Sequence, residues 1–278
     1  MFARLPRAKL LTMVACVTFA GVARAGEAAY PDWSGAWLRK TEGIFDPNRP
    51  KGRGQQPPLT PEFQKVWEKS FADQAAGGQG NNPTSECNPT GMPRMMISYG
   101  LGLEFVITPA VAYVIQAVPY METRRIFTDG RAWPENIDPA FTGTSIGHWE
   151  AAATPGHNDT LVVETRGMKG PRSFDSSGIP FHPENSTVVF ERIFLDPKSG
   201  ERLLNDTTVV DKALTRPWSV HRTYHRHRDP QWREVICNED EHQAKIGEER
   251  YYLSADGLLM PTRKGQPPPK LGDFGAAK

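Results

Sequence analysis

The sequence predicts an all-β protein, an antiparallel meander that closes into a barrel, with one short N-terminal helix and long N-terminal loops. Three observations support this prediction. Short runs of alternating apolar and polar residues recur from residue 103 onward. Turn residues such as Gly, Pro, Asn and Asp separate these runs. No helical periodicity lies between the runs, so neighbouring strands are expected to pair as hairpins.

The N-terminal 25 residues have the pattern of a cleavable signal peptide. Three basic residues precede an apolar run over residues 10–22, and Ala23 and Ala25 supply the small residues of a cleavage site. The run is shorter than the about 20 residues that span a bilayer. We therefore expect cleavage after Ala25, a periplasmic or secreted protein, and no integral membrane segment after cleavage. A lipoprotein with its lipid on Cys16 is the alternative.

Charge and cysteine content limit the classes of function. The formal net charge of +1 gives no electrostatic basis for binding nucleic acid or an anionic membrane surface. Cys87 and Cys237 remain after signal cleavage, and an oxidising compartment favours a disulfide between them over two buried thiols. No P-loop, dinucleotide fingerprint or haem attachment motif occurs, so no motif requires a cofactor.

The mature chain divides into three segments. Residues 26–102 are expected to form a strand, loop and helix segment that packs on the barrel, with Thr60 as N-cap and Pro61 in the first helical position. The barrel is expected over residues 103–264, followed by a flexible tail over residues 265–278. The expected strands are residues 104–108, 112–118, 122–128, 146–152, 160–165, 187–195, 202–210, 218–227, 232–237, 251–254 and 258–260.

The sequence Gly35-x-Trp37 is similar to the G-x-W in the first strand of lipocalin-like barrels. In those barrels the Trp closes one end and an Arg from a late strand packs on it, a position that Arg222 can take here. A lipocalin- or calycin-like barrel is therefore the expected closed form. An open sandwich, with Trp37 as an ordinary core residue, is the alternative.

Nine sequence blocks extend this similarity over most of the mature chain: DWSGAW, PPLTPEF, CNPTGMPRMM, EFVITP, ETRRIFTDGR, SIGHWE, DTLVVET, ERIFL and DKALTRPWSVHRTY. Together they resemble a family of secreted proteobacterial proteins that is frequent in sphingomonads. The resemblance runs from about Asp32 to Cys237 and is most specific over residues 92–96, 122–131 and 145–165. It implies secretion and a calycin-like β architecture, but no particular activity. Family members have a short Gly-Asp turn where this chain has the longer loop 154–158.

Histidines alternate along the expected strand at residues 218–227. His225 and His227 share one face about 7 Å apart, close enough to bind one divalent metal ion together, whereas His221 is too far along the strand to join them. In the alternative interpretation the apolar side of this strand, with Arg222 buried in it, faces the core and the histidines face solvent. The candidates for a third metal ligand are His148, Glu150, Glu239 and His242.

His148 and Glu150 share a strand face, with Ser145 on the preceding turn. A His beside a carboxylate can act as a general base, so these two are the candidate catalytic residues of a hydrolase, lyase or isomerase. The G-x-S-x-G elbow of serine hydrolases is missing from the sequence. The alternative is a polar strand face with Trp149 in the core.

Arg124 and Arg125 lie on opposite faces of one expected strand, so at least one guanidinium is inside the barrel or at its rim. A buried Arg needs a carboxylate partner. An anionic ligand can supply the carboxylate, which would make the Arg a ligand clamp. The alternative partners within the protein are Glu104, Glu122 and Glu150.

A methionine-rich segment around Arg94 is expected either to form a lid or plug over an apolar cavity or to pack beneath the first strand. The leading hypothesis is therefore a binding barrel for a small apolar or aromatic molecule. An enzyme on the same barrel, or an envelope protein that binds a partner chain, are the alternatives. The candidate ligand-binding residues are Trp37, Arg94, Met95, Met96, Arg124, Arg125, Trp149, Arg222 and Tyr224.

Overall fold

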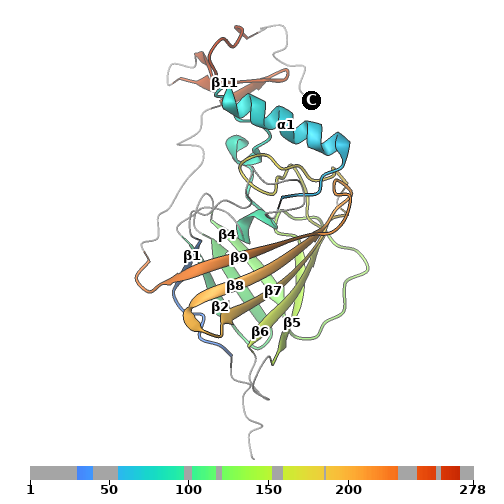
Figure 1. Cartoon of the computed structure of the whole chain (residues 1–278), viewed down its shortest axis with the longest axis vertical. Coiled ribbons are helices and arrows are strands. Elements are labelled where there is room, and N and C mark those ends of the chain that lie inside the picture. Colours follow the sequence, from blue (N-terminus) through green and yellow to red (C-terminus); the bar gives the residue numbers. More distant parts are fainter. Residues whose placement is uncertain are drawn as a thin grey trace, which may run out of the picture.

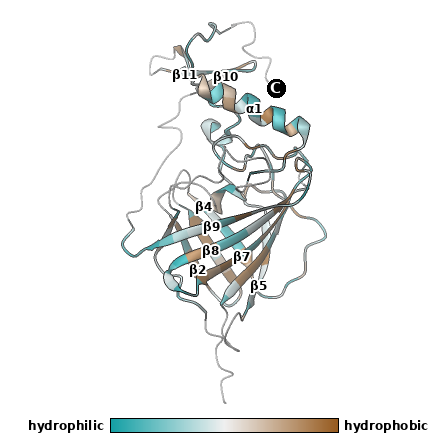
Figure 2. Ribbon diagram, viewed as in Figure 1, coloured by the Kyte–Doolittle hydropathy of each residue, from teal (hydrophilic) through white to brown (hydrophobic). Residues whose placement is uncertain are grey.

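Nine strands form a closed barrel in the computed structural model, which describes residues 30–39, 56–96, 102–116, 121–151, 159–184, 186–230, 243–254 and 258–269. Hydrophobic and hydrophilic residues alternate along the strands (Figure 2), which turns one set of side chains into the barrel. The predicted all-β class and the closure into a barrel are confirmed. The barrel strands are β1 (Ala36–Arg39), β2 (Leu103–Ile107), β3 (Val111–Gln116), β4 (Glu122–Phe127), β5 (Thr144–Glu150), β6 (Thr160–Arg166), β7 (Val188–Asp196), β8 (Ser199–Val210) and β9 (Trp218–His227).

The three remaining strands form a separate sheet. β10 (Gln243–Ile246), β11 (Glu249–Leu253) and β12 (Leu259–Pro261) are antiparallel and lie beside helix α1 (Pro61–Ala75), at one end of the molecule (Figure 1). The observed barrel differs from the expected residues 103–264 at both ends, because β1 also belongs to it and β10 to β12 do not. β1 covers the edges of β2 and β9, which would otherwise stay open. The expected strand at residues 232–237 lies outside the described residues.

One strand pair departs from the predicted antiparallel meander. β4 and β5 are parallel, with Ile126 opposite Ser145 and Phe127 opposite Ile146. A parallel pair needs a connection of roughly a dozen residues or more. Residues 128–143 lie between the two strands and provide this connection.

Helix α1 begins where the sequence predicts it. Thr60 caps the helix by accepting a hydrogen bond from the Phe63 amide at 3.5 Å, and a proline occupies the first turn. The buried face of the helix carries Trp67, whose indole donates to Ser177 Oγ at 3.1 Å. This contact holds α1 on the loop between β6 and β7.

Trp37 is fully buried near the barrel end that carries the β7–β8 hairpin. The guanidinium that packs on its ring belongs to Arg226, 4.5 Å from the ring centre, and not to Arg222 as predicted. The strand register explains the difference. Arg226 lies directly opposite Trp37, whereas Arg222 is four residues away from Arg226 along β9. Gly35 has a φ of +87°, and a side chain there would come within 2.9 Å of the His227 carbonyl oxygen.

Residues 90–96, which we call the plug, cover the barrel end that faces α1. The Glu122 carboxylate, at the start of β4, accepts hydrogen bonds from Thr90 Oγ1 at 2.6 Å and from the Gly91 amide at 2.9 Å. On the other side of the barrel the Tyr224 hydroxyl donates to the Met96 carbonyl oxygen, in the 3-10 helix η2 (Arg94–Met96). The methionine-rich segment spans the barrel from β4 to β9, with Met92, Met95 and Met96 packed in the hydrophobic core. An apolar cavity beneath it stays a prediction.

We expect Gly147→Ala to destabilise the barrel by about 1–3 kcal/mol. An added Cβ would lie 2.7 Å from the Val162 carbonyl oxygen and 3.0 Å from Ile126 Cγ2, so the neighbouring strands would have to shift. Urea unfolding followed by circular dichroism measures the change in the free energy of unfolding. Gly200→Ala is the matched control, because nothing lies within 4 Å of its added Cβ. An equal loss of stability in both variants would contradict the packing argument.

Candidate functional site

Polar side chains occupy inward-facing positions on six neighbouring barrel strands, β4 to β9. Each is buried, and the most accessible of them is 4 % exposed. Apolar residues flank them on the same face of each strand, as Val189 and Ile193 do around Glu191. We call this group the polar belt, and it consists of Arg124, Ser145, Thr165, Glu191, Asn205, Thr207, Arg222 and Tyr224.

A buried ion pair lies at the centre of the polar belt. Arg124 Nη2 is 2.5 Å from Glu191 Oε2, and both side chains are shielded from solvent. Arg124 also donates to Ser145 Oγ at 3.0 Å and to Thr165 Oγ1 at 2.8 Å, while Asn205 Nδ2 donates to the second oxygen of Glu191 at 2.9 Å. The buried Arg therefore has a carboxylate partner from β7, and the predicted partners Glu104, Glu122 and Glu150 are wrong. Glu191 is on β7, which does not pair with β4, so its side chain contacts Arg124 across the barrel interior.

Some buried polar atoms of the polar belt have no hydrogen-bond partner in the part of the chain that the structure describes. Arg124 Nη1, Asn205 Oδ1 and Thr207 Oγ1 are among them. A buried polar atom without a partner costs about 1–3 kcal/mol. The polar belt can therefore bind an additional acceptor group through Arg124 Nη1 and an additional donor group through Asn205 Oδ1 or Thr207 Oγ1.

The polar belt contains two guanidinium groups and a phenol. Arg124 pairs with the Glu191 carboxylate, and Arg222 donates to the His221 carbonyl oxygen at 2.9 Å. Burial raises the pKa of the Tyr224 phenol above its usual range, although the positive charge of Arg222 opposes this shift. Tyr224 therefore stays protonated and keeps its hydrogen bond to the plug.

The other predicted ligand-binding residues are distributed over the molecule. Arg125 is exposed on the outside of the barrel. Arg94 lies inside the plug, where Nη1 donates to Asn82 Oδ1 at 2.8 Å and to Ser173 Oγ at 3.2 Å. Trp149 packs on Trp33, with 5.3 Å between the two ring centroids, away from the polar belt. Of the predicted set, the structure brings together Arg124, Arg222, Tyr224 and Met96.

His148 and Glu150 form a pair on the outer surface of the barrel. His148 Nε2 is 3.2 Å from Glu150 Oε1, and their side chains are 65 % and 40 % exposed. Arg192 binds the same carboxylate at 2.9 Å and, with His148, lowers the pKa of Glu150. Ser145 points to the opposite face of β5, into the polar belt. The pair is therefore an exposed ion-pair network, and neither cavity described below is lined by it.

The histidines of β9 also face outward. Trp218, Val220 and Tyr224 are buried on the other face, as the alternative interpretation of this strand states. His221 is 2.6 Å from Asp206 on β8. Among the described residues no group of three His, Cys, Asp or Glu side chains is arranged to hold a metal ion. Two of the proposed third ligands, Glu239 and His242, lie outside the described residues, so the metal site at His225 and His227 stays a prediction.

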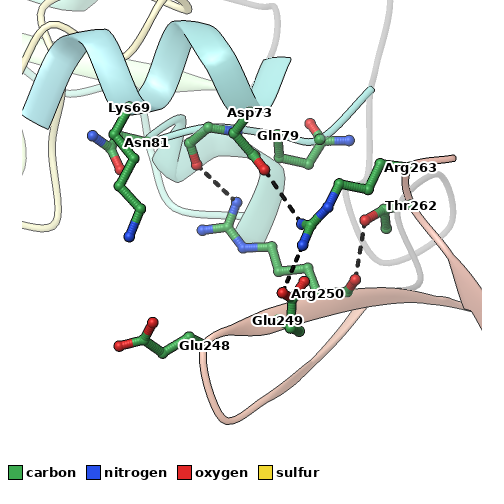
Figure 3. Close-up of a pocket in the computed structure, with 11 residues that line it drawn as sticks. Lys69, Asp73, Gln79, Asn81, Glu248, Glu249, Arg250, Thr262 and Arg263 are labelled. Carbon is green, nitrogen blue, oxygen red and sulfur yellow. Dashed lines mark hydrogen bonds and ion pairs between the residues drawn. The ribbon is translucent and has the colours of Figure 1, made fainter. Parts of the chain in front are cut away.

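A cleft of about 360 Å³ lies between α1, the loop that follows it and the β10–β12 sheet (Figure 3). A second cavity of about 310 Å³ shares Asn81 and Arg250 with the cleft and is lined by Val66 and three prolines. Sequence reasoning missed both cavities, because residues distant in the chain and outside any motif form them. The cleft is lined by Lys69, Asp73, Gly78, Gln79, Gly80, Asn81, Glu248, Glu249, Arg250, Thr262 and Arg263.

Comparison of the chain with protein-family models, with curated proteins and with solved structures finds no match. The closed barrel is consistent with the calycin-like architecture that the sequence resemblance implies. Among the described helices, none is long and apolar enough to cross a membrane.

We expect Arg124→Met to destabilise the protein by roughly 3–5 kcal/mol, because it leaves the buried Glu191 carboxylate without its cation. The double variant Arg124→Met with Glu191→Gln removes both charges and should recover most of this loss. Arg125→Met, on the outside of the same strand, is the matched control and should change stability by at most about 0.5 kcal/mol. Chemical denaturation of the wild type, Arg124→Met, Glu191→Gln and the double variant gives the coupling energy between Arg124 and Glu191. Equal losses of stability in Arg124→Met and in the double variant would show that the unpaired Glu191 carboxylate does not cause the destabilisation.

Proposed function

We propose that this protein is an exported binding protein whose barrel interior holds the acidic group of a small organic anion. The observation that carries the proposal is the polar belt, in which the buried Arg124 retains a guanidinium nitrogen without a partner. Guanidinium groups bind carboxylates with strong, directed hydrogen bonds.

The guanidinium nitrogen Nη1 of Arg124 supports an anionic ligand. It is buried and has no hydrogen-bond partner among the described residues, and a buried donor without a partner costs about 1–3 kcal/mol. A ligand carboxylate would accept a hydrogen bond from Arg124 Nη1. A hydroxyl or amide on the same ligand would pair with Asn205 Oδ1 or Thr207 Oγ1. The expected apolar or aromatic ligand thus becomes an amphipathic one with an acidic group.

The plug supports binding inside the barrel because it lies directly over the polar belt. Tyr224 belongs to the belt and donates to the Met96 carbonyl oxygen. A ligand that reaches Arg124 from this end must displace the plug, whose methionine side chains adapt readily to new neighbours. The alternative function, acid–base catalysis by His148 and Glu150, lacks comparable support since both side chains are on the outer surface.

Native mass spectrometry of the protein purified from its own cell envelope tests the proposal. We expect a bound organic acid in the wild type and in Arg125→Met, and its loss in Arg124→Met. The double variant Arg124→Met with Glu191→Gln repeats the test without a buried unpaired charge, in case the single variant does not fold. Retention of a ligand by all the variants, or the absence of any ligand from the wild type, would contradict the proposal.

Export completes the proposed function, and it rests on the signal-peptide pattern of residues 1–25. The expected disulfide fits the same compartment: Cys87 follows the 3-10 helix η1 (Pro83–Glu86), whereas its predicted partner Cys237 lies outside the described residues.

We expect the mature protein to begin at Gly26 and to contain no free thiol. The intact mass of the exported protein, with and without reduction before alkylation, measures both features. Alkylation without reduction should leave the mass unchanged. An unprocessed N-terminus or a lipid on Cys16 would contradict the assigned cleavage site.

A further inference from the structure

The geometry points to a second binding site, in the cleft between α1 and the β10–β12 sheet, that takes a small zwitterion such as a free amino acid with an apolar side chain (Figure 3). This site is separate from the polar belt and does not depend on the function proposed for the barrel. Its volume of about 360 Å³ is sufficient for a small ligand only.

Ion pairs and hydrogen bonds between the two walls hold the cleft in shape. Arg263 bridges them, with one nitrogen 3.3 Å from Asp73 of α1 and another 2.6 Å from Glu249 of β11. Arg250 ties the sheet to the segment after α1, since it lies 2.7 Å from Glu86 and donates to Ser85 Oγ at 2.8 Å. A site whose walls are fixed in this way loses less conformational entropy when a ligand binds.

The charges of the cleft lining indicate which ligand it suits. Three cationic and three anionic side chains line it, so a ligand with a net charge of either sign gains little from them. Four of the six are engaged in the ion pairs described above. The other two, Lys69 and Glu248, have opposite charges, and neither makes an ion pair with another described residue.

Lys69 lies on the α1 wall of the cleft and Glu248 on the facing wall, at the β10–β11 turn. In Figure 3 both side chains lie at the left end of the cleft. The ammonium group of Lys69 is placed to bind a carboxylate, and the carboxylate of Glu248 is placed to bind an ammonium group. A zwitterion satisfies both, whereas a simple anion or cation satisfies one. Beyond Arg250, the adjoining cavity offers the apolar surfaces of Val66 and Pro83 to a side chain.

Isothermal titration calorimetry of the purified protein with L-leucine tests this inference. N-acetyl-L-leucine, which carries only the negative charge, and L-leucinamide, which carries only the positive charge, are matched probes. We expect each to bind about ten-fold more weakly than L-leucine, since each loses one charged contact. Equal affinity for the three probes, or no binding of L-leucine, would overturn the assignment.

Variants then locate the site. Lys69→Gln and Glu248→Gln should each weaken L-leucine binding about ten-fold, by the same loss of one charged contact. The charge-exchanged double variant, Lys69→Glu with Glu248→Lys, should bind more tightly than either single variant, because it again presents one charge of each sign. Lys198→Gln, on the β7–β8 turn of the barrel, is the control and should bind as the wild type does. Unchanged affinity in the two cleft variants would show that any L-leucine binding occurs elsewhere.

Discussion

The buried ion pair between Arg124 and Glu191 is the constraint on which the barrel interior depends. Two charges removed from water cost several kcal/mol each unless partners surround them. Ser145, Thr165 and Asn205 supply those partners from three other strands, which explains why polar residues interrupt the apolar faces of β5, β6 and β8. The pair also fixes the strand register, because a slip of one residue would turn a charged side chain out of the network and an outward residue into it.

The two proposed sites use charge in different ways. In the polar belt, burial strengthens the attraction between Arg124 and a carboxylate, because the interior screens charges far less than water does. In the cleft, water reaches the lining and screens its charges. Only the charged side chains outside the ion pairs are available to bind a ligand. The two sites also differ in what holds them in shape. The belt is built on barrel strands, whereas the cleft depends on ion pairs between α1 and a small sheet.

The sequence predicts the fold class because the period of two along the strands is a local signal. The alternation along β9 identifies its buried face, and Thr60 identifies the start of α1. What the sequence does not predict depends on register and on distant partners. Arg222 and Arg226 lie on the same face of β9, and only the pairing with β1 places Arg226 on Trp37. Similarly, Glu191 is one of several carboxylates on the predicted strands, and barrel closure alone selects it as the partner of Arg124. The parallel β4–β5 pair and the cleft have no local signal at all.

The position of β1 has a consequence for how the chain folds. β1 is the first strand of the chain, yet its longest pairing is with β9, the last strand of the barrel. Loop closure over so many residues is entropically expensive, and contacts of such high sequence separation form slowly. The hairpins from β5 to β9 are local and can assemble first, whereas Trp37 can be buried against Arg226 only after the chain has been made through β9. Until that step the edges of β2 and β9 are open, so the interval before closure is when the chain is most exposed to pairing with other chains.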